Sequence, residues 1–142
     1  MKTMMKLFLI VLLPVLNYAQ PSNQEEAIKS VLVKLFDASK TKNFTAASEF
    51  IIYRGADKTR EWKDTYKISN ATELDEVKRI CKKIKALLDL SSGYEFKRLA
   101  IEKESEGEWF IQEVEFKSGG QNLTTRFAFL NVNGNFILGD ID

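Results

Sequence analysis

The side chains in this chain that could take part in acid–base chemistry are carboxylates and tyrosines, because the sequence contains no histidine. Without histidine, Ser-His and Cys-His nucleophile systems are excluded, as are nearly all protein zinc sites. A carboxylate held in a pocket can still act as a general base beside a hydroxyl donor. The candidate bases are Asp140 and Asp57, with Tyr53 or Tyr66 as the hydrogen-bond donor. We expect no metal site and no cofactor.

Cys81 is the single cysteine, so no disulfide forms within the chain. A reactive thiol needs an electropositive, partly open setting. Cys81 instead falls in the middle of an apolar helical pattern, and we expect it to pack in the core.

The stretch from Tyr53 to Tyr66 interleaves aromatic and charged residues, with Trp62 between its ends. Amphipathic aromatic side chains among charges suit a polar ligand or a protein partner. The alternative is a charged loop that only covers the mouth of a pocket. Both interpretations stay open.

The first residues have the pattern of a secretory signal peptide, with Lys2 and Lys6 ahead of the apolar run Leu7–Leu13. That run is shorter than the roughly 20 residues that cross a bilayer, and no cysteine follows it for lipid attachment. We expect cleavage of residues 1–19 and a single periplasmic or secreted domain over residues 20–142, without membrane insertion. With 21 basic and 20 acidic residues, the chain has no basic excess for nucleic acid or anionic membrane.

Helical patterns fill the first part of the predicted domain. Ser22–Glu25 has the S-x-x-E spacing of a capping box, and apolar residues at helical spacing follow it, so we expect a helix over 23–39. A shorter helix is expected over 45–52. A long third helix is expected over 72–90, with Thr72 as its cap.

Strand patterns fill the rest of the chain, from Tyr94 onward. They are separated by the turn signals Glu106-Gly107, Ser118–Gly120 and Asn133-Gly134, which predicts a four-stranded antiparallel meander. The fold class is therefore α+β, with three N-terminal helices packed on a curved antiparallel sheet of roughly four to six strands.

Asn133-Gly134 predicts a two-residue type I′ hairpin turn. That turn places Phe129 opposite Leu138 and Phe127 opposite Asp140. Asp140 would then lie on the aromatic face, where a carboxylate is either at a solvated rim or in a pocket. The other face of this hairpin is also apolar. Three helices cover only one face, so we expect a homodimer through the outer face of the sheet.

The order of elements and the closing strand pattern FLNVNGNFILGDID resemble the nuclear transport factor 2-like (NTF2-like) superfamily. This is a cone-shaped α+β fold shared with ketosteroid isomerases and polyketide cyclases. The resemblance implies a pocket between the helices and the sheet and a dimer through the sheet's outer face. The isomerase tyrosine is missing from the first predicted helix and the dehydratase histidine is absent, so no catalytic residues are carried over. The chain is most similar to secreted bacterial members of unknown function.

Three hypotheses about function follow. The first is a non-enzymatic protein that binds a small apolar or amphipathic ligand, or a partner protein, in or near the pocket between helices and sheet. The second is an isomerase or cyclase type of enzyme that uses a pocket carboxylate as general base. The third is a protein-interaction module whose cone is filled by its own side chains. The candidate ligand-binding residues are Phe127, Phe129, Phe136, Leu138, Asp140, Tyr53, Trp62 and Tyr66.

Overall fold

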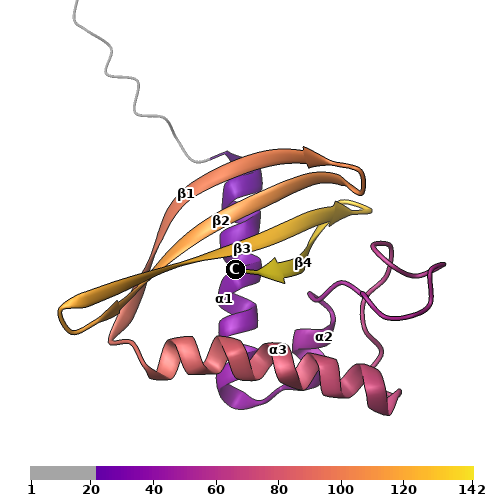
Figure 1. Ribbon diagram of the computed structural model, residues 1–142, viewed down its shortest axis with the longest axis horizontal. Coiled ribbons are helices and arrows are strands. Elements are labelled where there is room, and N and C mark those ends of the chain that lie inside the picture. The colour runs from indigo at the N-terminus through magenta and orange to yellow at the C-terminus, as the bar shows by residue number, and fades with distance from the viewer. Residues whose placement is uncertain (1–21) are drawn as a thin grey trace, which may run out of the picture.

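The computed structural model describes residues 22–142, and the predicted signal peptide over residues 1–19 lies outside the described residues. Three helices are followed by four strands (Figure 1). In chain order, the elements are α1 (Asn23–Thr41), α2 (Phe44–Ser48), α3 (Ala71–Asp89), β1 (Gly93–Glu104), β2 (Gly107–Ser118), β3 (Gln121–Val132) and β4 (Asn135–Ile141). None of the helices in residues 22–142 is long and apolar enough to cross a membrane.

The first and third helices agree with the sequence patterns that predicted them. Ser22 caps α1 by accepting a hydrogen bond from the backbone N–H of Glu25 at 3.1 Å, as the capping box predicts. The cap of α3 is Asn70 rather than Thr72, because the Asn70 side chain accepts from the backbone N–H of Glu73 at 3.2 Å.

The second helix is shorter than predicted and ends at Ser48. Ile51 forms a parallel β-bridge with Leu138, and Ile52 forms an antiparallel bridge with Thr65. The backbone groups that would have extended the helix are used in these bridges instead. The segment after α2 is therefore fixed beside β4.

The strands form one antiparallel sheet in the order β1-β2-β3-β4. The sheet arches over α3 in Figure 1, and α1 passes behind it. Phenylalanines from α1 and the inner face pack ring to ring, with the centroids of Phe36 and Phe127 5.6 Å apart and those of Phe110 and Phe136 5.1 Å apart. The α+β fold class is confirmed, and the order of elements is that expected of an NTF2-like cone.

The hairpin between β3 and β4 has the predicted turn but not the whole predicted register. Asn133 and Gly134 have φ values of 53° and 84°, as a type I′ turn requires, and Phe129 lies opposite Leu138. Beyond that pair the register shifts, because Gly139 is an extra residue in β4. The predicted pairing of Phe127 with Asp140 is therefore wrong.

The shifted register exchanges the faces of the last residues of β4. Asp140 pairs with Ala128, on the outer face of the sheet, and Phe127 pairs with Ile141. The side chain of Ile141 packs against the inner core. The Asp140 carboxylate, predicted on the aromatic face, therefore lies on the outer face.

The outer face of the sheet is also covered within the single chain. Trp62, from the loop after α2, packs edge to face on Trp109 with ring centroids 5.4 Å apart. The buried residues of this outer cluster are Ile52, Trp109, Ile111, Leu130 and Ile137. The two-sided apolar pattern therefore does not require a second protomer, and the homodimer stays a prediction.

Candidate functional site

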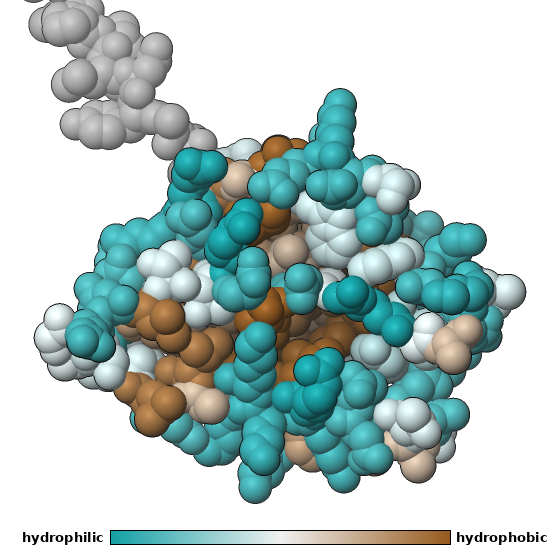
Figure 2. All heavy atoms as spheres, viewed as in Figure 1, coloured by the Kyte–Doolittle hydropathy of each residue, from teal (hydrophilic) through white to brown (hydrophobic). Residues whose placement is uncertain are grey.

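A groove of about 550 Å³ lies between α3 and the last residues of β4. Figure 2 shows hydrophobic atoms exposed in a hollow between these two elements, bordered by hydrophilic side chains. We call it the α3–β4 groove. Its lining residues are Ile51, Ile52, Arg54, Gly55, Tyr66, Thr72, Glu76, Arg79, Ile80, Lys83, Leu138, Gly139, Asp140 and Ile141.

The floor of the α3–β4 groove is apolar and fixed by the fold. Ile51 and Leu138 are only 1% and 2% exposed, and the bridge between them holds them side by side. Ile80 on the α3 side and Ile141 on the β4 side of the groove add to this apolar floor. Such a floor can bury an apolar part of a ligand.

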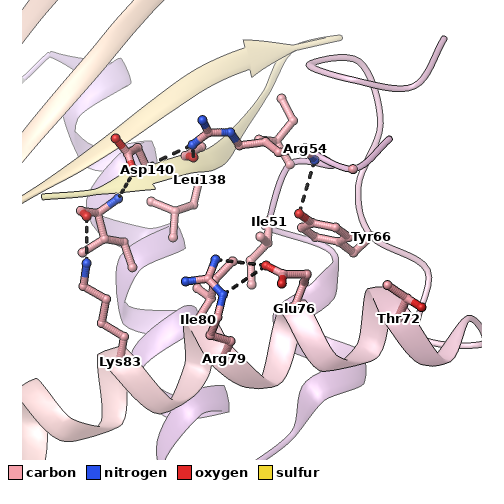
Figure 3. A pocket seen from close by; sticks show the side chains of 14 residues that line it. Ile51, Arg54, Tyr66, Thr72, Glu76, Arg79, Ile80, Lys83, Leu138 and Asp140 are labelled. Atoms are coloured by element: carbon pink, nitrogen blue, oxygen red, sulfur yellow. Dashed lines mark hydrogen bonds and ion pairs between the residues drawn. The ribbon is translucent and has the colours of Figure 1, made fainter. Parts of the chain in front are cut away.

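The rim of the groove is charged, with three cationic and two anionic side chains. Arg79 makes two hydrogen bonds to Oε2 of Glu76, 3.1 Å from Nε and 3.0 Å from Nη2 (Figure 3). Arg54 approaches Asp140 more loosely, with 3.8 Å between Nη1 and Oδ1. Lys83 supplies the third cation and is not matched by a third carboxylate of the lining.

Arg54 and Lys83 direct their charges at backbone carbonyls of β4. Arg54 donates from Nη1 to the carbonyl oxygen of Gly139 at 3.1 Å, and Lys83 donates from Nζ to that of Ile141 at 2.9 Å. These donors are exposed and their acceptors are neutral. An anion entering the groove would offer both cations a stronger, charge-assisted partner.

Tyr66 forms the end wall of the groove next to Arg54 (Figure 3). Its hydroxyl oxygen accepts from the backbone N–H of Arg54 at 3.3 Å. Burial raises the pKa of the Tyr66 phenol, so the hydroxyl stays protonated at neutral pH. A protonated hydroxyl that accepts one hydrogen bond still has a proton to donate to a bound group.

The loop that carries Arg54 and Tyr66 is held to α3 by Arg60. Its guanidinium donates to Oδ2 of Asp64 and Oε1 of Glu73, each at 2.8 Å, and stacks 4.1 Å from the centroid of Tyr53. These bonds from Arg60 hold the pKa values of Asp64 and Glu73 below their usual range. The loop side of the groove is thereby positioned against the first turn of α3.

Three of the eight ligand-binding candidates from the sequence line the α3–β4 groove. They are Leu138 in the floor, Tyr66 in the end wall, and Asp140 on the rim, whose side chain is 62% exposed. Trp62 lies on the other side of Asp140, against Trp109 on the outer face.

The other candidates are core residues in this structure. Phe127 and Phe129 are fully buried, and Phe136 packs on Phe110. Tyr53 is buried beneath Arg60, and its hydroxyl accepts from the backbone N–H of Asp57 at 3.0 Å. The structure therefore does not bring these four together with the groove.

The remaining chemical candidates lie away from the groove. Asp57 is exposed and accepts hydrogen bonds from the backbone and hydroxyl of Thr59, which lower the pKa of its carboxyl. Cys81 is buried, and this burial raises the pKa of its thiol, so its predicted core position is confirmed. Within residues 22–142, no three His, Cys, Asp or Glu side chains cluster as metal ligands would.

Sequence reasoning missed the contribution of α3 to the groove. Glu76, Arg79, Ile80 and Lys83 follow the i, i+3, i+4, i+7 spacing of one helical face. That spacing was visible in the sequence. What faces it was not, because the opposite wall comes from a bulged strand and from the bridge of Ile51 to β4.

Comparison with known proteins finds little beyond the fold. No protein-family model matches the chain, and no curated protein is a significant match. Among solved structures, the chain is similar to a crystal structure of a candidate NTF2-like transpeptidase from Campylobacter jejuni, with 12% identity and a TM-score of 0.48. The match covers 84% of this chain and 99% of that one. At these values it says nothing about activity or ligand, and the NTF2-like assignment refers to the α+β architecture alone.

Proposed function

We propose that this protein binds a small amphipathic molecule with an anionic group, and that the α3–β4 groove is the binding site. The observation that carries the proposal is the combination of a buried apolar floor, Ile51 and Leu138, with a rim of three cations and two carboxylates. The apolar part of the ligand lies on the floor and the anion lies at the rim.

The anion replaces the neutral partners of Arg54 and Lys83. Each of these side chains now donates to a backbone carbonyl of β4. Charge-assisted hydrogen bonds are roughly twice as strong as those between neutral groups, so the exchange favours binding. Tyr66 donates its hydroxyl proton to a second polar atom of the ligand.

The enzyme alternative gains no support from a buried base. Asp140 is exposed and faces Arg54, and Asp57 lies outside the groove. We therefore propose a binding role without turnover. It acts in the periplasm or outside the cell, after removal of the predicted signal peptide over residues 1–19.

Decanoate and decyltrimethylammonium test the proposal, because they share an alkyl chain and carry opposite charges. Decanoate is expected to shift the backbone amide signals of Leu138 and Ile141 in an NMR titration, and the cation is not. Equal shifts from both compounds, or none from decanoate, would contradict the proposal.

A matched pair of variants on α3 localises the site. Lys83→Glu reverses a charge in the groove, and we expect it to weaken decanoate binding at least about tenfold. Lys82→Glu makes the same change one residue earlier, at an exposed position that does not line the groove. Equal losses in both variants would indicate a general charge effect and not a site.

A further inference from the structure

We infer that the ligand of the α3–β4 groove is an extended peptide that adds a strand to the open edge of β4 at Ile141 and places a carboxylate at Lys83. The inference rests on the proposed function and names its ligand class. It is carried by the backbone hydrogen bonds along the edge of β4 that does not face β3.

The chain itself already pairs one of its own segments with this edge at Leu138, three residues before Ile141. The backbone N–H of Leu138 donates to the carbonyl oxygen of Phe50 at 2.7 Å, and the N–H of Ile52 donates to the carbonyl oxygen of Leu138 at 2.9 Å. The edge at Leu138 is therefore paired with the segment 50–52 in a parallel bridge.

Ile141 presents the same two backbone groups, but side chains satisfy them. Its N–H donates to Oδ1 of the neighbouring Asp140 at 3.0 Å, and its carbonyl oxygen accepts from Lys83 Nζ at 2.9 Å. Both side chains are exposed. They occupy the two positions that a neighbouring strand would take, and they can rotate away when one arrives.

The segment 50–52 does not reach Ile141, because it turns away from β4 at Tyr53. The backbone N–H of Tyr53 donates to the carbonyl oxygen of Asp64 at 2.8 Å, and its carbonyl oxygen accepts from Trp62 at 3.2 Å. The place beside Ile141 is open space, within the groove of about 550 Å³.

A strand at this place would lie between an edge strand and a helix, which is a recurring mode of peptide recognition. Main-chain hydrogen bonds to Ile141 supply affinity, and the apolar floor accepts one side chain of the peptide. Lys83, released from the Ile141 carbonyl, is then free to hold a carboxylate of the peptide.

The probes are N-acetyl trivaline with a free carboxylate, and its relatives with isoleucine, leucine or phenylalanine at the last position. Each is compared with its C-terminal amide and with versions methylated at one backbone nitrogen at a time. We expect binding by at least one free acid, with protection of the Ile141 amide from hydrogen exchange. Amidation and one of the N-methylations should each weaken that binding at least about tenfold.

Decanoate separates failure of this inference from failure of the proposed function. If decanoate binds in the groove and no peptide does, or if every N-methylated peptide binds as well as its parent, strand addition is wrong and the proposed function stands. If neither decanoate nor any peptide binds, both are wrong.

A variant tests the same hydrogen bond from the protein side. Ile141→Pro removes the N–H that points to the open edge. The pairing of β4 with β3 keeps all of its hydrogen-bond donors. We expect it to abolish peptide binding and to weaken decanoate binding by a smaller factor, because only the strand needs this N–H. Unchanged peptide affinity would contradict strand addition, and the N-methylated peptides give the same test if this variant does not fold.

Discussion

The ring of Trp109 occupies the space that a side chain on Gly139 would need. A Cβ built on Gly139 would lie 2.5 Å from Cζ3 and 2.6 Å from Cη2 of Trp109. Gly139 is also the extra residue that shifts the register of β4. Trp109 thus leaves room only for a glycine at this bulge, next to Asp140, and the contact belongs to the geometry of the groove as well as to the core.

Gly139→Ala should destabilise the protein, because the new methyl group clashes with a buried ring in a packed cluster. Overpacking of this kind costs about 1–3 kcal/mol in the free energy of unfolding, which urea denaturation measures. Gly120→Ala is the matched control, since nothing lies within 4 Å of its added Cβ. Equal free energies of unfolding for the two variants would contradict the packing that we describe.

The last hairpin shows which part of the register can be predicted from the sequence and which part cannot. Asn133-Gly134 specifies its turn locally, through positive φ at both positions, and the pairing next to the turn follows from it. The bulge at Gly139 lies against Trp109, which is 30 positions earlier in the chain and on a strand that does not pair with β4. A periodic pattern contains no information about such a contact, so Asp140 was assigned to the wrong face.

The candidate site shows the same limit. The helical period of α3 placed its apolar stripe correctly, with Val77, Cys81 and Ile84 buried. The charged residues beside that stripe have the composition of a solvated helix face. They become one wall of a groove only because α2 ends at Ser48 and the following segment pairs with β4.

Asp140→Ala should strengthen the binding of decanoate. The Asp140 carboxylate lies on the rim of the groove and competes with an anionic ligand for Arg54, at 3.8 Å. An exposed pair of this kind contributes about 0.2–1 kcal/mol, so Kd by calorimetric titration should fall by a factor of roughly 1.4 to 5. Weaker binding would instead support the prediction from the sequence that Asp140 is a ligand-binding residue.

The thiol of Cys81 should be inert while the protein is folded. It is buried on α3, and burial raises its pKa, so little thiolate is present or accessible at neutral pH. Its reaction with Ellman's reagent should be at least ~100-fold slower in native buffer than in 6 M guanidinium chloride, because labelling requires opening of the core. Complete labelling within seconds in native buffer would show that α3 does not stay packed on α1 and the rest of the core.

Acid should weaken the attachment of the loop to α3. Glu73 is only 8% exposed and accepts hydrogen bonds from Arg60 at 2.8 Å and from the backbone N–H of Lys67 at 3.1 Å. The first of these bonds is the main cause of its lowered pKa, so the folded protein binds fewer protons than the unfolded chain in acid. The stabilisation is full above the ordinary value of 4.5 and is lost as the pH falls through the lower folded value.

Glu73→Gln isolates this contribution, since the amide keeps an acceptor oxygen and loses the charge. At pH 7 the free energy of unfolding of the variant should be about 1.5–3 kcal/mol lower than that of the wild type, which is the usual contribution of a hydrogen bond to a charged group. The difference should be smaller at pH 3 than at pH 7, because below pH 4.5 the unfolded chain takes up a proton that the folded carboxyl still resists. Glu104→Gln, at an exposed position on β1, is the control and should change the free energy of unfolding by less than about 0.5 kcal/mol. A Glu73→Gln difference that is the same at both pH values would show that the charge of Glu73 does not hold the loop.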